Sequence, residues 1–81
     1  MKGVVKYINC SSGLCAIETS NNNFTIFEDF DEGLSIGDTV VGNLDSLGNE
    51  SLFNETTKFY VEGFIEDFAC SLDSFLRSFE F

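Results

Sequence analysis

The chain opens with the stretch that decides its fold, Lys2-Gly3-Val4-Val5-Lys6-Tyr7-Ile8-Asn9, followed after four residues by Leu14-Cys15-Ala16-Ile17. Residues 2–9 alternate in polarity and are rich in Val, Tyr and Ile, which is typical of a half-buried β-strand. Residues 10–13 are predicted to form a turn, in which Gly13 can take a positive φ. Residues 14–19 then form a second strand, so the sequence predicts an N-terminal β-hairpin.

Three further strands are predicted, at residues 24–28, 39–44 and 59–66. Residues 50–54 are interpreted as a short extension that follows a turn. The charged, glycine-containing segment 29–38 is predicted to be a long connection that lets a small barrel cross over. Five short strands separated by turns favour a mainly β fold, and a small barrel rather than a sandwich. Side chains alternate along the last strand. One face carries Phe59, Val61, Gly63 and Ile65, and the other carries Tyr60, Glu62, Phe64 and Glu66.

The hydrophobic period changes near the C-terminus and predicts a short helix at residues 68–78. Its apolar stripe has helical spacing and consists of Phe68, Leu72, Phe75, Leu76 and Phe79. The stripe can close one end of the barrel, or it can lie across a binding face. A third alternative leaves an apolar patch for a partner or a second copy of the chain, formed by Phe75, Phe79 and Phe81.

Length and composition predict one domain, residues 1–81, with 14 acidic and 4 basic side chains and a net charge of −10. The apolar stretches are much shorter than the roughly 20 residues needed to cross a bilayer. No signal-peptide pattern is present, and three cysteines leave one unpaired, so we expect a soluble protein in the reducing cytoplasm. An anionic surface repels polyanions and attracts basic partners.

Enzymatic chemistry is not expected, because the chain has no histidine to act as a proton shuttle. The acidic segment 29–32 resembles a solvated loop more than a pair of catalytic carboxylates. As a calcium loop it fails, because Phe30 would stand where an oxygen ligand is required. The glycines follow no nucleotide-binding spacing. We therefore expect no cofactor and no metal site.

Residues 2–17 resemble the opening hairpin of cold-shock domains, which are small OB-type barrels that bind single-stranded nucleic acid. The family strand has the pattern Lys-Gly-x-Val-Lys-Trp-Phe-Asn. In this chain the matching residues are Gly3, Val5, Lys6 and Asn9, with Tyr7 at the Trp position and Ile8 at the Phe position. The resemblance implies a single five-stranded OB-like barrel with a C-terminal helix.

The resemblance weakens after the first strand. The family motif Lys-Gly-Tyr/Phe-Gly-Phe-Ile corresponds to residues 12–17, which lack the lysine and both stacking aromatics. The motif Val-Phe-Val-His-Phe falls on residues 24–28, where Thr25 and Glu28 replace aromatics and Phe27 replaces His. The candidate nucleic-acid contacts that remain on the strand 1–3 face are Lys2, Lys6, Tyr7 and Phe27.

Each stacked base contributes about 1–3 kcal/mol, so the missing aromatics remove much of the affinity for a single strand. The sequence therefore predicts a non-enzymatic interaction module that binds a protein. The module is expected to be a monomer or a homodimer. Its acidic surface would steer a basic partner, and Phe75, Phe79 and Phe81 would anchor it. The alternatives are weak or specialised single-strand binding and mimicry of nucleic acid by the acidic surface.

Overall fold

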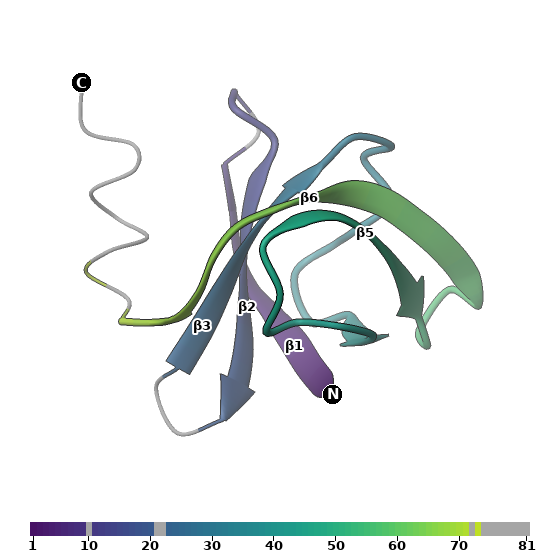
Figure 1. Cartoon of the computed structure of the whole chain (residues 1–81). Coiled ribbons are helices and arrows are strands. Elements are labelled where there is room, and N and C mark those ends of the chain that lie inside the picture. The colour runs from purple at the N-terminus through teal and green to yellow at the C-terminus, as the bar shows by residue number, and fades with distance from the viewer. Residues whose placement is uncertain (10, 21–22, 72, 74–81) are drawn as a thin grey trace.

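A computed structural model describes residues 1–9, 11–20, 23–71 and 73 of the chain. These residues contain six β-strands. They are β1 (Lys2–Asn9), β2 (Leu14–Ser20), β3 (Asn23–Asp29), β4 (Thr39–Val41), β5 (Gly48–Asn54) and β6 (Phe59–Cys70) (Figure 1). The strands close into a barrel of order β1-β2-β3-β6-β5-β4, because β4 pairs with β1. Every neighbouring pair is antiparallel.

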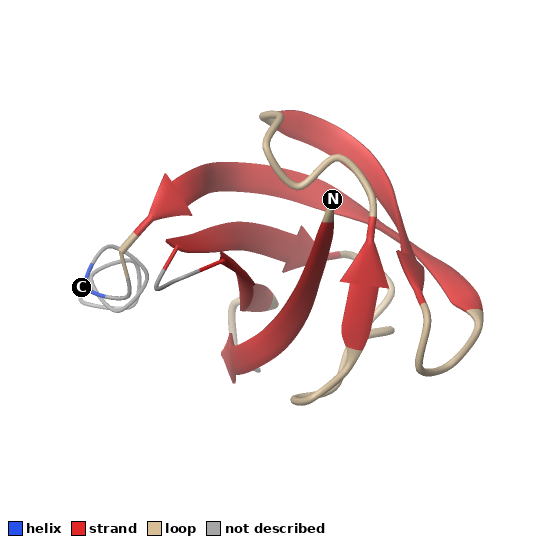
Figure 2. Cartoon of the chain, turned by 90° about the horizontal axis from the view of Figure 1, so that it is seen from below, coloured by secondary structure: helices blue, strands red, loops and turns tan. Residues whose placement is uncertain are grey.

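Two three-stranded meanders build this barrel, β1-β2-β3 and β4-β5-β6 (Figure 2). Residues 30–38 form a crossover loop that carries the chain from the end of β3 to β4, beside β1. The predicted turn after the first strand is confirmed, since Gly13 has a φ of 76°. The predicted mainly β barrel is also confirmed, and a closed barrel of this size is compatible with an OB-like fold.

The predicted number of five strands is wrong, because residues 48–54 form a full strand. Only Leu52 and Phe53 are large and apolar in β5, so its sequence carries a weak alternation. Its backbone nevertheless pairs with β6 along its whole length and with β4 at Phe53 and Asn54, and this pairing gives hydrogen-bond partners to its N–H and C=O groups there. The strand predicted at 39–44 ends earlier, at Val41, and the chain bends at Gly42.

The predicted start of the C-terminal helix is also wrong, because β6 continues through Cys70. Cys70 pairs with Phe24 on β3, and Asp67 pairs with Ile26. An available strand partner therefore overrides the helical spacing of the apolar residues. Beyond Ser71 the structure describes a single residue, so the rest of the predicted helix lies outside the described residues. The predicted partner-binding residues Phe75, Phe79 and Phe81 lie outside them as well.

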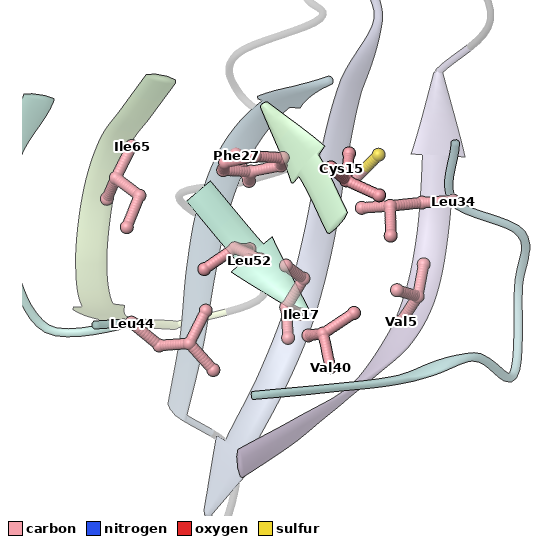
Figure 3. Close-up of a cluster of buried hydrophobic side chains, with 10 residues drawn as sticks. Val5, Cys15, Ile17, Phe27, Leu34, Val40, Leu44, Leu52 and Ile65 are labelled. Carbon is pink, nitrogen blue, oxygen red and sulfur yellow. The ribbon is translucent and has the colours of Figure 1, made fainter. Parts of the chain in front are cut away.

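The interior of the barrel is filled by one apolar cluster to which all six strands and the two loops flanking β4 contribute (Figure 3). Its members are Val5, Cys15, Ile17, Phe27, Leu34, Val40, Leu44, Leu52, Val61 and Ile65. The Phe27 ring lies where a side chain at Gly63 would otherwise stand. A large residue thus faces the smallest one across β3 and β6, which lets the narrow interior pack densely.

A buried polar network anchors the crossover loop to the end of β5. Asn54 is fully buried, and its Nδ2 donates to Asp38 Oδ2 at 2.7 Å and to the Gly33 carbonyl at 3.2 Å. Asp38 Oδ2 also accepts the Ser35 N–H at 2.9 Å, and Asn54 Oδ1 accepts the Thr56 N–H at 3.0 Å. Neutral donors thus satisfy a nearly buried carboxylate, which has no cationic partner among the residues that the structure describes.

We predict that Asn54→Leu lowers the free energy of unfolding by about 3 kcal/mol, because it leaves the Asp38 carboxylate buried without its side-chain donor. Urea denaturation followed by circular dichroism measures the change. Asn49→Leu, at an exposed position of the same strand, is the control. An Asn54→Leu protein as stable as the control would contradict the role given to the network.

We also predict that Gly63→Ala lowers the free energy of unfolding by at least about 2 kcal/mol, because the new methyl group would overlap the Glu28 carbonyl oxygen and the Phe27 ring. Gly33→Ala is the matched comparison, since its methyl group would meet a Val61 methyl at 2.9 Å. It should cost about 1 kcal/mol. Thermal unfolding measures both variants. An equal decrease in the free energy of unfolding would show that the close contacts at Gly63 destabilise the variant no more than those at Gly33.

Candidate interaction surfaces

A β-bulge in β1 lies at two of the residues that the sequence predicts as candidate nucleic-acid contacts. Val5 pairs with Ile17, but the next paired residue is Tyr7, which faces Ala16. Lys6 is the extra residue of the bulge, so its side chain does not follow the alternation between inward and outward positions along β1. Lys6 and Tyr7 are both exposed, so these neighbours are presented together on the surface.

Carboxylates accompany both lysines of this face. Lys6 Nζ lies 3.9 Å from Glu18 Oε1, and Lys2 Nζ lies 3.3 Å from Glu55 Oε1. Exposed ion pairs of this kind contribute at most about 1 kcal/mol to stability, so they can open. They nevertheless cancel the local positive charge that a phosphate would need.

Phe27 lies inside the barrel and is fully buried, so it offers no ring to a nucleotide. Thr25 is also fully buried, and its hydroxyl donates to the Leu44 carbonyl at 2.6 Å. Glu28 lies on the opposite, outward face of β3. The three positions that resemble stacking positions of cold-shock domains therefore do not form one surface.

The outer face of β2 and β3 carries a second apolar cluster. Its buried members are Ala16, Phe24 and Ile26, with Leu14 and Cys70 packed against them. The Tyr7 ring adjoins this cluster, with its centroid 6.5 Å from that of Phe24 and the two planes tilted by 49°. Only Tyr7 among these side chains combines a ring with substantial exposure, so the face lacks a row of stacking platforms.

An acidic pair stands at the border of the same face. Glu28 pairs with Phe64 in the β3–β6 ladder, and Glu66 lies two residues further along β6, a diagonal neighbour. Burial raises the pKa of Glu66, and its hydrogen bond to Glu28 and the negative charge of Glu28 raise it further. The two carboxylates add repulsion toward a polyanion beside the strand 1–3 face.

Three aromatic residues lie at the β5–β6 hairpin, and we name them together the β5–β6 aromatic patch. They are the cross-strand pair Phe53 and Tyr60, and Phe59, which precedes Tyr60 at the start of β6. Phe59 and Tyr60 are 72% and 69% exposed, the highest values among the large hydrophobic side chains of the described residues. The rings of Phe53 and Tyr60 face each other across the ladder, with centroids 5.1 Å apart. Val41 pairs with Phe53 on the other side and continues the row.

The alternation in the sequence did not reveal this patch, because it groups Phe59 with Val61 and Ile65 on one face of the strand and Tyr60 on the other. Phe59 opens β6 beside Asn54, at the rim of the barrel, and the interior positions of β6 begin at Val61. The signal in the sequence was the presence of aromatics on both sides of the turn at residues 55–58. Such a pattern predicts a cross-strand aromatic pair.

Comparisons with family models, curated proteins and solved structures find no match for this chain. Across the part of the chain that the structure describes, no three His, Cys, Asp or Glu side chains come together in a way that could hold a metal ion. Within the same residues, no helix has the length and apolar character needed to cross a membrane.

The Glu28–Glu66 pair leads to a prediction about pH. A raised pKa means that the folded state binds the proton more tightly than the unfolded state, so the charged pair destabilises the fold above that pKa. We predict that Glu66→Gln raises the melting temperature at pH 7 and that the gain disappears as the pH falls below the ordinary pKa of glutamate.

Melting temperatures measured by calorimetry from pH 7 down to about pH 3 test this prediction. Glu62→Gln, on the same strand, is the control for the loss of one negative charge from a strongly anionic chain. The gain of Glu66→Gln should exceed that of the control at pH 7. A Glu66→Gln protein that melts below the wild type at pH 7 would refute the repulsion between the two carboxylates.

Proposed function

We propose that this protein is a non-enzymatic interaction module of the cytoplasm that binds another protein through the β5–β6 aromatic patch. The observation that carries the proposal is the exposure of Phe59 and Tyr60, together with the support that Phe53 gives to the Tyr60 ring. Exposed aromatic side chains with fixed neighbours are the residues that most often dominate binding energy at protein interfaces.

The charge of the chain favours a partner with a basic surface. A net charge of −10 steers cationic proteins toward the barrel and raises their rate of association at low salt. The same charge, with Lys2 and Lys6 paired to carboxylates, disfavours nucleic acid. The proposal includes an origin from an OB-type barrel of the cold-shock kind, whose hairpin pattern residues 2–17 resemble.

The test is a pull-down from lysate of the native host with the immobilised protein, with and without nuclease. We predict that the double variant Phe59→Ser/Tyr60→Ser loses the captured proteins, because it removes the two most exposed rings of the patch. Leu47→Ser is the matched control, since it removes a 61% exposed apolar side chain from the β4–β5 turn. The Leu47→Ser protein should retain the captured proteins. Treatment with nuclease should change the result for neither variant.

A second candidate function is single-strand binding at the β1 bulge, where Lys6 and Tyr7 are exposed side by side. Fluorescence anisotropy with labelled oligo-dT distinguishes it from the first. Salt-sensitive micromolar binding that Tyr7→Ala abolishes, together with nuclease-sensitive capture, would replace protein binding by nucleic-acid binding. Lack of binding to the oligonucleotide removes the second candidate.

A further inference from the structure

A pocket of about 390 Å³ opens where the β1–β2 turn meets the crossover loop. Its apolar walls come from three parts of the chain, with Ile8 on β1, Cys15 on β2, and Leu34 and Ile36 in the loop. The volume lies within the range of about 300–1,000 Å³ that is common for small-molecule sites. Figure 3 shows Cys15 and Leu34 together in the adjoining core.

Two acidic residues line the same pocket, Asp29 and Glu32. Asp29 is only 8% exposed, and its oxygens accept the N–H groups of Asp31 at 3.2 Å and of Leu34 at 3.0 Å. A carboxylate can accept about four hydrogen bonds, so Asp29 retains capacity for a ligand. Glu32 is exposed at the rim, and none of the described residues that line the pocket is Lys or Arg.

Backbone hydrogen bonds hold the walls of the pocket in place. The Asp29 N–H donates to the Gly13 carbonyl at 2.9 Å and joins the end of β3 to the β1–β2 turn. The Gly37 N–H donates to the Val5 carbonyl at 2.8 Å and ties the crossover loop to β1. A pocket fixed in this way is already formed before a ligand enters, which reduces the entropic cost of binding.

We propose that this pocket binds a small organic cation that consists of an aliphatic chain and an ammonium head. The chain would lie against Ile8, Leu34 and Ile36, and the head would lie between the carboxylates of Asp29 and Glu32. An ammonium group leaving water needs anionic or hydrogen-bonding partners, and this pocket supplies them. The same carboxylates repel a ligand with an anionic head. This site does not depend on the proposed protein contacts of the β5–β6 aromatic patch.

Titration of the ¹⁵N-labelled protein with n-hexylammonium chloride, followed by amide chemical shifts, tests the proposal. n-Hexanol and sodium n-hexanoate are the matched ligands without charge and with the opposite charge. We expect saturable shifts at residues 8, 13, 15 and 32–36, weaker binding of hexanol, and still weaker binding of hexanoate. Affinity should rise by about fourfold per methylene from n-butylammonium to n-hexylammonium.

Two variants separate the roles of charge and space. Glu32→Gln should weaken n-hexylammonium binding by about threefold, as expected for a partly exposed charge, and leave n-hexanol unchanged. Ser35→Trp should block both ligands, because Ser35 lines the pocket and is exposed. Asp45→Asn, in the β4–β5 turn, removes the same charge elsewhere and should leave the affinity for n-hexylammonium unchanged.

Equal binding of n-hexanoate and n-hexylammonium would overturn the proposal. It would also fail if the shifts spread over the whole barrel, or if they did not saturate at millimolar concentrations. An equal loss in Asp45→Asn and Glu32→Gln would show a general attraction between cations and an acidic protein, and would refute a site.

Discussion

The hydrogen bond between the Asn54 amide and the Asp38 carboxylate fastens the crossover loop through which the chain closes the barrel. It joins the crossover loop to the end of β5 at a place where Asp38 is only 6% exposed. The carboxylate has no cation beside it among the described contacts, so neutral donors must satisfy it. Asp38 also joins the loop to β1, because its carbonyl accepts the Val5 N–H at 2.9 Å. β4 follows directly and pairs with β1, and this pairing closes the barrel.

Closure of the barrel also decides how charge and aromatic surface are distributed. A single closed sheet forms the barrel, so side chains that point away from the interior are either exposed or packed in a cluster on the outer face of the sheet. On the β1–β3 side this produces an apolar cluster with carboxylates around it, and the lysines there are ion-paired. On the β5–β6 side it produces exposed rings. The barrel therefore presents two chemically different surfaces.

The resemblance of the sequence to cold-shock domains is strongest in residues 2–17, where the predicted hairpin is present. β1 and β2 pair as antiparallel strands, and Lys6 and Tyr7 are both exposed at the bulge after Val5. On β3 the likeness has no such counterpart, since Phe27 and Glu28 lie on opposite sides of the wall. A shift of one residue along a strand exchanges the two faces, so a short sequence match cannot carry a binding surface with it.

The amino-acid sequence alone determined the strands whose alternation is strong. It predicted β1, β2 and β3, the turn at Gly13, and the common face of Val61, Gly63 and Ile65, because a period of two is a local property of the chain.

Tertiary structure alone decided the rest. β5 has few large apolar residues and exists as a strand because it pairs on both sides, and β6 runs to Cys70 because β3 offers it a partner. Alternation along a strand defines two faces but does not determine which residues lie inside the barrel. The closed arrangement of the strands determines this, and it buries Phe27 and leaves Phe59 exposed at the rim.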